Sequence, residues 1–182
     1  DAETISLMGD KINSKNFCTK ENIPTLQKTS KVSDAKKIGF PILVKASAGG
    51  GGKGMRIVKT EKELKDAVIA AKREAKSSFD DDRVFLEKYI EHSRHIEVQI
   101  LGDNFGNVIH LGERECSIQR RHQKIIEESP SSRLTNKIRE DITSAAVKLG
   151  KKLDYKSAGT VEFLFDEDTN EFWFLEVNTR LQ

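Results

Sequence analysis

Four consecutive glycines, Gly49–Gly52, separate two short apolar runs in this chain. The run Gly39–Lys45 precedes them and the run Met55–Val58 follows, and both have the length and composition of β-strands. Strand, glycine loop and strand predict a β-hairpin, whereas a P-loop needs a helix directly after its glycines. The most distinctive segment of the chain therefore favours a glycine-tipped hairpin and excludes a P-loop.

The same glycine loop has the chemistry of a phosphate site. Because glycine has no Cβ, successive backbone N–H groups in such a loop can turn toward one anion. Lys45 before the loop and Lys53 within it supply positive charge. Residues 46–54 are therefore predicted to bind a phosphate chain, and the alternative is a flexible hairpin tip.

Helical and strand patterns flank this hairpin. Apolar residues recur at helical spacing over 60–79 and over 134–153. A strict alternation places His95, Glu97 and Gln99 on one face of a strand, with isoleucine and valine on the other. Further strands are predicted at 108–111, 159–165 and 171–177, and residues 84–90 are predicted to be a strand or a linker. The pattern predicts an α+β fold with antiparallel hairpins and two packing helices.

Composition excludes several classes of protein. The 182 residues are 36% hydrophobic, which suits one domain, with or without a subdomain, and not a disordered chain. Lysine plus arginine number 31 against 29 acidic residues, too balanced for a dedicated nucleic-acid binder. No apolar run is long enough to span a membrane, and two cysteines exclude a disulfide scaffold. Neither a nucleic-acid nor a membrane partner is expected.

A pair of carboxylates is the second chemical signal. Glu162 and Glu176 lie on two predicted strands, and a hairpin centred on Thr169 places them directly opposite, with Cβ atoms about 5 Å apart. Like charges in such positions repel each other and call for a cation. Mg²⁺ prefers carboxylate oxygens and commonly shares its ligands with phosphates. The pair predicts a metal site, and the alternative is a solvated strand face in another register.

The same strand parity continues beyond Glu176. Asn178, Arg180 and Gln182 are expected on the face of the carboxylates if the strand persists, where an amide, a fixed cation and a second amide could hold a small planar anion. The alternative is a strand that ends in a loop. Trp173 is expected on the opposite face, in the core.

A dense cationic segment, residues 114–124, is the third signal. Taken alone it indicates a solvated loop or an RNA-facing patch. Glu127 and Glu128 follow directly and cancel much of its charge, which weakens the RNA interpretation. Cys116 has no second cysteine near it and His122 has no metal-ligand spacing, so no zinc site is predicted.

These motifs together resemble a known family, the biotin carboxylases. The segments that occur in the family's order are Lys45–Arg56, Glu87–Tyr89, Arg94–Glu97, Glu115–Lys124 and Glu176–Gln182. The resemblance covers almost the whole chain from Met8 onward. It is greatest to the α subunits of propionyl-CoA and methylcrotonyl-CoA carboxylases, with pyruvate and acetyl-CoA carboxylases as open alternatives.

The resemblance implies an ATP-grasp fold. It implies a lead-in helix over 1–20, a lid subdomain over 21–86 that contains the glycine loop, and a catalytic subdomain over 87–182 that is truncated at its C-terminus. Segment 25–35 is shorter than its counterpart in the family, and the family's general-base glutamate lies beyond the last residue. The chain is therefore expected to be part of a larger enzyme and inactive alone.

The resemblance also implies roles for individual residues. It implies that ATP is bound by the following residues, the last four of which form a hinge strand: Lys11, Lys45, Gly51, Gly52, His95, Gln119, His122, Glu87, Lys88, Tyr89 and Ile90. Mg²⁺ or Mn²⁺ falls to Glu162, Glu176 and Asn178. Bicarbonate falls to Lys124, Arg180 and Gln182, of which Lys124 and Arg180 are expected to be catalytic.

The implied activity is that of an ATP-grasp ligase. Bicarbonate attacks the γ-phosphorus of MgATP to give carboxyphosphate, and the CO₂ released carboxylates biotin on a carrier domain. The implied partners are that carrier domain, a carboxyltransferase and further copies of the enzyme, in the mitochondrial matrix or the cytoplasm. A carboxylate–amine ligase of the same fold, or a non-catalytic nucleotide-binding module, remains an alternative.

Overall fold

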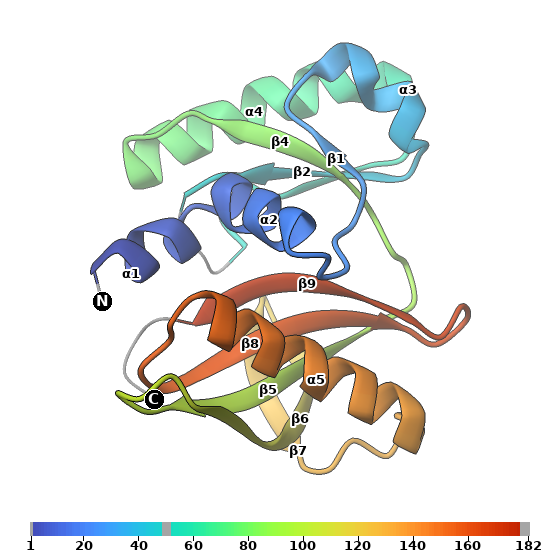
Figure 1. Ribbon diagram of the computed structural model, residues 1–182. Helices are drawn as coiled ribbons and strands as arrows, with labels where there is room; N and C mark the ends of the chain where they lie inside the picture. Colours follow the sequence, from blue (N-terminus) through green and yellow to red (C-terminus); the bar gives the residue numbers. More distant parts are fainter. Residues whose placement is uncertain (1, 49–51, 179–182) are drawn as a thin grey trace. The chain divides into compact units, whose positions relative to one another are not determined.

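The computed structural model describes residues 2–48 and 52–178 (Figure 1). The chain divides into two compact units, each built on an antiparallel sheet. The small unit comprises Asp10–Ile12 and Leu26–Glu91. The large unit comprises Asp1–Gly9, Asn13–Thr25 and His92–Gln182. The α+β class with antiparallel sheets and packing helices, predicted from the sequence, is confirmed.

The small unit contains a four-stranded sheet in the order β1-β4-β2-β3. Its elements are β1 (Lys28–Thr29), η1 (Val32–Asp34), α3 (Ala35–Ile38), β2 (Ile42–Ala46), β3 (Arg56–Val58), α4 (Glu61–Phe79) and β4 (Val84–Lys88). β2 and β3 pair antiparallel on either side of the glycine loop, as the hairpin prediction required. Segment 21–36 is more ordered than its low apolar content indicates, since it contributes β1, η1 and the start of α3.

Helix α4 covers β2 and β3 with an apolar stripe (Figure 1). Leu64, Val68 and Ala71 are buried in the core of the small unit. At the start of the helix, the Glu63 carboxylate accepts a hydrogen bond of 3.3 Å from the backbone N–H of Thr60. This contact satisfies a donor that the helix leaves unpaired, so the boundary lies where the capping pattern predicts.

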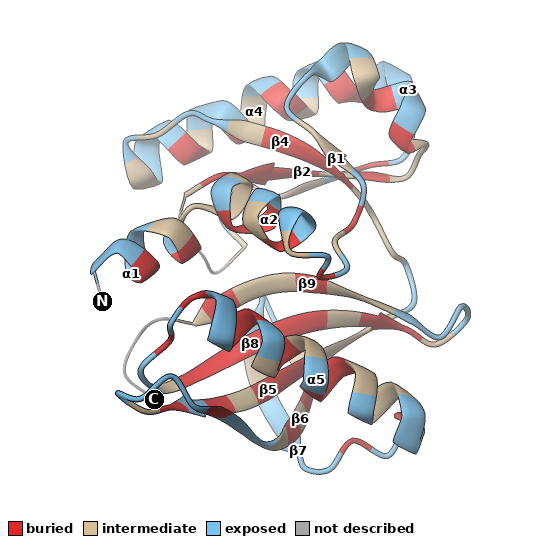
Figure 2. Cartoon of the chain, in the orientation of Figure 1, coloured by how far each residue is buried: buried red, intermediate tan, exposed pale blue. Residues whose placement is uncertain are grey.

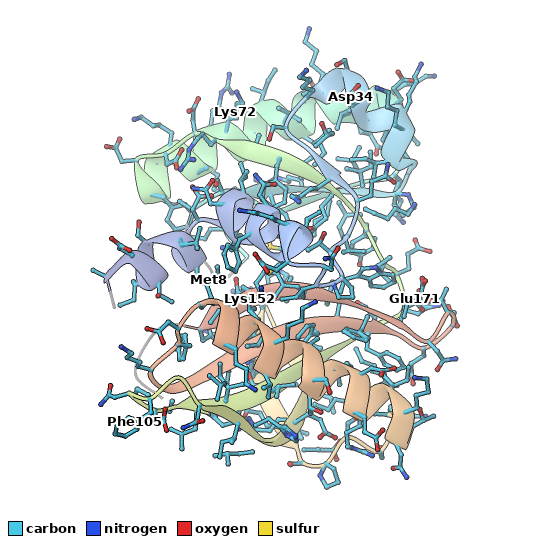
Figure 3. All side chains as sticks on the ribbon, in the orientation of Figure 1. Met8, Asp34, Lys72, Phe105, Lys152 and Glu171 are labelled. Carbon is cyan, nitrogen blue, oxygen red and sulfur yellow. The ribbon has the colours of Figure 1, made fainter. Side chains whose placement is uncertain are left out.

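The large unit contains a five-stranded sheet in the order β7-β6-β5-β8-β9. Its strands are β5 (Ser93–Gly102), β6 (Val108–Arg120), β7 (Gln123–Glu128), β8 (Ser157–Asp166) and β9 (Glu171–Asn178). Its helices are α1 (Ala2–Gly9), the main part of α2 (Lys11–Lys20) and α5 (Asn136–Lys152). Lys152, at the C-terminal end of α5 (Figure 3), forms a 2.9 Å ion pair with Glu21, which follows α2.

The two faces of the large sheet differ in chemistry. One face is apolar and packs against α5, whose buried residues Ile142, Ala146 and Leu149 join Ile96 and Phe163 of the strands in one core (Figure 2). The other face, called the charged face below, carries the polar residues of the alternation. Its central members are His95, Glu97, Gln99, Thr160 and Glu162, and the β5–β8 register brings them together. The alternation therefore separates the core from a charged face.

The hairpin of β8 and β9 contains one residue more than a regular pairing needs. Glu162 lies opposite Glu176, as the sequence predicted. The next pair is Phe163 with Phe174, so Leu175 is an extra residue in β9. An extra residue of this kind is a β-bulge, which bends the strand and shifts its alternation. Near the turn, the paired residues are centred between Asp168 and Thr169 and not on Thr169 as predicted. Because the bulge adds one residue to β9, Glu162 and Glu176 still lie opposite each other.

The bulge makes one prediction wrong. Trp173 lies opposite Leu164, which shares its face with Glu162, and the indole is only half-buried. Regular alternation along β9 predicts the other face, in the core. Phe174 takes the core position instead and stacks edge-to-face on Phe163, with ring centroids 6.4 Å apart.

The cationic segment 114–124 is also not the loop that its composition indicated. It forms the end of β6 and the start of β7, with Gln119 opposite Lys124 and Arg120 opposite Gln123. Arg121 and His122 form the two-residue turn between them, with φ angles of 52° and 64°. Positive φ at both turn residues matches the twist of paired strands. The segment is therefore a hairpin whose β6 arm borders the charged face.

A glycine in β5 gives a first prediction. A Cβ on Gly102 would lie 1.8 Å from the carbonyl oxygen of Tyr155, which is backbone and cannot move aside locally. Gly102→Ala is expected to lower the free energy of unfolding of the chain by about 1–3 kcal/mol, as overpacking does. Urea denaturation measures this change. Gly9→Ala, with nothing within 4 Å of the added Cβ, is the control, and an equal effect of both variants would contradict the structure.

Candidate functional site

Glu162 lies at the centre of the charged face of the large unit. One carboxylate oxygen, Oε1, accepts hydrogen bonds from Lys124 Nζ at 2.9 Å and from Asn178 Nδ2 at 2.6 Å. The other oxygen, Oε2, lies 2.6 Å from Nε2 of His95. Strands β5, β7, β8 and β9 thus place four predicted site residues in contact. The carboxylate is buried, and each of these contacts comes from a polar group.

The orientation of His95 follows from its neighbours. The side-chain amide nitrogen of Gln119 donates to the carbonyl oxygen of Cys116 at 2.7 Å, so this end of the amide is the nitrogen. The same nitrogen lies 2.8 Å from His95 Nδ1, which must therefore accept. Nε2 then carries the proton and donates it to Glu162. Gln119 and His95, predicted to line one site, are in direct contact.

Lys124 connects Glu162 to a second buried carboxylate, Glu97. Its ammonium forms a short hydrogen bond with Glu97 Oε2 in addition to the contact with Glu162. The second oxygen of Glu97 accepts from Nε of Arg114 at 2.5 Å. Two carboxylates and two cations therefore alternate along this face, with Lys124 between Glu97 and Glu162.

Burial and charge act in opposite directions on these groups. Burial by itself would raise the pKa of the Glu162 carboxyl, but the hydrogen bonds from His95 and Lys124, together with the charge of Lys124, outweigh it and lower the pKa to about 2. Burial would lower the pKa of Lys124, but its hydrogen bonds to Glu97 and Glu162 raise it above the usual value. At neutral pH, Glu162 is therefore an anion and Lys124 a cation.

The β8–β9 hairpin offers the donor set that a hard cation prefers. Glu162 and Glu176 are opposite each other, and Asn178 contacts Glu162. Two carboxylates and an amide oxygen suit Mg²⁺ or Mn²⁺, which take oxygen ligands. The three predicted ligands are of the types that such an ion takes, and in this structure the Glu162 oxygens accept hydrogen bonds from Lys124, His95 and the amide nitrogen of Asn178.

A second group of possible ligands lies nearby. The ligand atoms of Glu97, Cys116 and Glu127 are all within 4.8 Å of one another, a proximity that the spacing of the cysteine in the sequence did not indicate. Both oxygens of Glu97 are already bound by Arg114 and Lys124. Burial, helped by the charge of Glu97, raises the pKa of the Cys116 thiol to about 12, so the thiol is protonated at neutral pH. This group thus combines a hydrogen-bonded carboxylate with a thiol, whereas the predicted set on the β8–β9 hairpin offers oxygen donors.

In the small unit, the predicted phosphate-binding residues lie around the root of the glycine loop. Lys45, at the end of β2, is buried and forms a 3.2 Å ion pair with Glu87 of β4. The backbone N–H of Lys11 donates to the carbonyl of Ser47 at 3.0 Å. The Ser47 hydroxyl donates to Asp10, at 3.1 Å. These bonds anchor Lys11 beside the strand end that enters the loop.

The hinge strand is held by the small unit on both sides. The backbone N–H of Lys88 donates to Gln27 and that of Tyr89 donates to Pro41. The Lys88 ammonium donates to the carbonyls of Gly39 and Phe40, at 3.2 Å each. The segment is therefore held in place by hydrogen bonds within the small unit.

The remaining predicted residues are placed less directly. His122 lies at the exposed tip of the β6–β7 hairpin, away from the contacts of Glu162 that the structure describes. Gly52 lies in the turn that follows residues 49–51, which are outside the described part of the chain. Gly51, Arg180 and Gln182 fall outside the described residues. Their assigned roles stay predictions.

Two residues of the charged face, Glu97 and Arg114, have no site role that sequence reasoning predicted. The alternation in β5 places Glu97 on the same face as His95, but it gives no indication of its partner. The pairing of β5 with β6 puts Arg114 directly opposite Glu97. A hairpin prediction across the turn 103–107 with the correct register would have revealed the pair.

Comparison with known proteins places this geometry in a family. A family model described as carbamoyl-phosphate synthase L chain, ATP binding domain, matches residues 2–182. The chain belongs to this family. The fold of this ATP-binding domain is the ATP-grasp fold of biotin carboxylases, as the resemblance implied. Among the residues that the structure describes, no helix is long and apolar enough to cross a membrane.

The similar proteins are biotin-dependent carboxylases. The ATP-binding domain is 50% identical to the alpha subunit of the mitochondrial methylcrotonoyl-CoA carboxylase of Dictyostelium discoideum, covering 100% of this chain and 27% of that protein. It is 48% identical to the biotin carboxylase of a Nostoc species, covering 99% of this chain and 42% of that protein.

A solved structure extends the similarity to three dimensions. The biotin carboxylase domain dimer of the Hydrogenobacter thermophilus 2-oxoglutarate carboxylase, in complex with MgADP, ADP and bicarbonate, has a TM-score of 0.93 and 48% identity. The alignment covers 99% of this chain and 41% of that one. The ATP-binding domain thus spans less than half the length of each of these relatives.

Proposed function

We propose that the chain is the ATP-binding part of a biotin carboxylase, which uses ATP and bicarbonate to carboxylate biotin on a carrier domain through carboxyphosphate. The observation that carries the proposal is the charged face around Glu162. It combines an oxygen donor set for a divalent cation with an ammonium, Lys124, that can meet an anion beside that cation. The relatives named above support it, since one of them binds MgADP and bicarbonate.

Each group of the charged face has a defined task in this proposal. Glu162, Glu176 and Asn178 hold Mg²⁺ or Mn²⁺, which when bound neutralises charge on the phosphates. Lys124, Arg180 and Gln182 bind bicarbonate and orient its oxygen toward the γ-phosphorus. His95, held by Gln119, orients the Glu162 carboxylate through its Nε2 proton.

The nucleotide contacts in this proposal follow the predicted roles. The phosphates are assigned to Lys11 and Lys45, with Gly51 and Gly52 in the loop over them, and adenine is assigned to Glu87–Ile90. The remaining nucleotide-site residues are His95, Gln119 and His122. In the small unit, the Lys45–Glu87 ion pair positions the lysine that meets the phosphate chain. Charge neutralisation and positioning are the main means of accelerating phosphoryl transfer.

We also propose that the full-length protein is an acyl-CoA carboxylase α subunit of the propionyl-CoA or methylcrotonyl-CoA type. The glycine loop, the Glu127–Glu128 pair and the Asn178–Gln182 segment support this choice. Its partners would be a biotin carrier domain, a carboxyltransferase and a second copy of the biotin carboxylase, in the mitochondrial matrix or the cytoplasm. Reconstitution with propionyl-CoA, methylcrotonyl-CoA or pyruvate as acceptor tests the choice.

The central test is ADP release by the full-length protein that contains this chain. A biotin carboxylase is expected to release ADP only when biotin and bicarbonate are both present. Release that requires an amine and another carboxylate, and not biotin, would support a carboxylate–amine ligase of the same fold. Nucleotide binding without any turnover would support a non-catalytic module.

Lys45 gives a prediction about the nucleotide. Lys45→Ala in the full-length protein is expected to weaken MgATP binding by about 1.5–3 kcal/mol, the usual contribution of a hydrogen bond to a charged group. Isothermal titration calorimetry measures it. Lys59→Ala, at an exposed position after β3, is the control. Because Lys45→Ala leaves Glu87 buried without this cation, the double variant with Glu87→Gln separates binding from folding; unchanged affinity in both variants would refute the role of Lys45.

A further inference from the structure

We propose that Arg114 is a positioning residue for anion binding at Lys124. Its guanidinium forms a hydrogen bond with one of the two carboxylate oxygens of Glu97 and neutralises part of that negative charge. The positive charge of Lys124 therefore stays available to bicarbonate. The inference rests on the proposed function and deepens it. It concerns a residue that the nucleotide, metal and bicarbonate assignments leave without a task.

Arg114, on β6, is fixed in place by contacts that reach β5 and β8. Its Nε donates to Glu97 Oε1 at 2.5 Å, and its terminal nitrogen donates to the Gln99 side-chain oxygen at 3.1 Å. The Gln99 amide nitrogen donates in turn to the carbonyl of Gly159 in β8, at 2.9 Å. Because a guanidinium is planar and its donors are rigidly arranged, these bonds set the rotation of the Glu97 carboxylate.

The rotation of the Glu97 carboxylate determines which of its oxygens contacts the Lys124 ammonium. With Oε1 of Glu97 bound to Arg114, the other oxygen, Oε2, faces the Lys124 ammonium. Glu97 has only 5% of its side chain exposed, so water cannot replace a lost cation. Lys124 has 22% exposed and can therefore meet a ligand as well as its two carboxylates.

The charges give the direction of the effect. Along the contacts Arg114–Glu97–Lys124–Glu162, two carboxylates alternate with two cations, and the more exposed Glu127 lies 3.9 Å from Nε of Arg114. Without Arg114, the whole charge of Glu97 would fall on Lys124, which already pairs with Glu162. An incoming anion would then meet excess negative charge, whereas a divalent cation would be attracted more strongly. Loss of Arg114 should therefore weaken bicarbonate binding most, because in MgATP the stronger attraction of the metal ion offsets the repulsion of the phosphates.

The other face of the same sheet provides a matched control. Arg139 of α5 forms a 2.8 Å ion pair with the buried Glu113 of β6, next to Arg114 in sequence. The exposed fractions nearly coincide, 28% and 3% for Arg139 and Glu113 against 29% and 5% for Arg114 and Glu97. Both pairs join a partly exposed arginine to a buried glutamate, but of these two glutamates it is Glu97 that contacts Lys124.

The experiment compares three variants of the full-length protein, Arg114→Gln, Arg114→Lys and Arg139→Gln. Initial rates of biotin-dependent ADP release are measured against bicarbonate and, separately, against MgATP. Arg114→Gln is expected to raise the KM for bicarbonate about tenfold and to leave the KM for MgATP within about threefold. Arg114→Lys, which keeps the charge, should restore most of the bicarbonate KM.

Arg139→Gln is expected to lower the melting temperature as much as Arg114→Gln without changing the KM for bicarbonate. An unchanged bicarbonate KM in Arg114→Gln overturns the inference, as does an equal rise for both substrates or for Arg139→Gln. If the wild-type protein releases no ADP in response to bicarbonate and biotin, the proposed function itself is overturned. If the wild-type protein turns over and Arg114→Gln leaves the KM for bicarbonate unchanged, the inference about Arg114 is overturned and the proposed function is not.

Discussion

Glu176→Gln in the full-length protein is expected to lower biotin-dependent ATP hydrolysis by roughly 10²-fold or more, the scale for loss of one preorganised charged contact in a transition state. The glutamine keeps the shape of the side chain opposite Glu162 but removes the negative charge that holds a divalent cation. The fold should survive, because Glu176 lies on the charged face and not in the core.

Steady-state ADP release, measured at increasing Mg²⁺ concentration, checks this expectation. The control is Glu171→Gln, which removes the same charge from the exposed start of the same strand, β9 (Figure 3). Equal turnover of Glu176→Gln and wild type at limiting Mg²⁺ would contradict the metal assignment. So would a structure with MgADP in which both carboxylates lie more than about 6 Å from the ion, far outside the ~2.1 Å of coordination.

Arg180→Lys is expected to spare nucleotide binding and to cut carboxylation of biotin by roughly 10²-fold, again the loss of one transition-state donor. Arginine offers two parallel hydrogen bonds to a planar anion, whereas lysine offers a point charge. Arg180 lies outside the described residues, so the expectation rests on the strand parity of Glu176 and Asn178 in the sequence.

Carboxylated biotin and MgATP affinity are measured in parallel for this variant. Arg133→Lys, at an exposed position before α5, serves as its control. Intact carboxylation with lost affinity for ATP would show that Arg180 contacts the nucleotide instead of bicarbonate. The two measurements therefore separate the two roles.

The parts of this site that depend on alternation within one strand could be predicted from the sequence. His95, Glu97 and Gln99 share a face because a strand has a period of two, and this holds whatever the strand pairs with. The predicted opposition of Glu162 and Glu176 is confirmed as well. The predicted position of Trp173 is wrong, because a bulge depends on local packing and leaves no sequence signal of its own.

Contacts between distant strands were harder to foresee. The β6–β7 turn consists of Arg121 and His122 and contains neither glycine nor asparagine, so the hairpin had no turn signal. The Lys45–Glu87 pair joins residues 42 apart in sequence and depends on the register of β2 with β4. The Glu97–Arg114 pair likewise requires the β5–β6 register. Pairing between strands, and not the pattern along any one strand, carries this information.

The extra residue in β9 has a consequence for how such hairpins can vary among relatives. Leu175 separates the part of the hairpin near the turn from the part that bears Glu176 and Asn178. A relative that lacks this residue would keep Glu176 opposite Glu162, because regular alternation from Phe174 onward already puts the glutamate on the charged face. The turn and the metal-binding end can thus change length by one residue independently of each other. An alignment gap at this point is compatible with an intact pair of carboxylates.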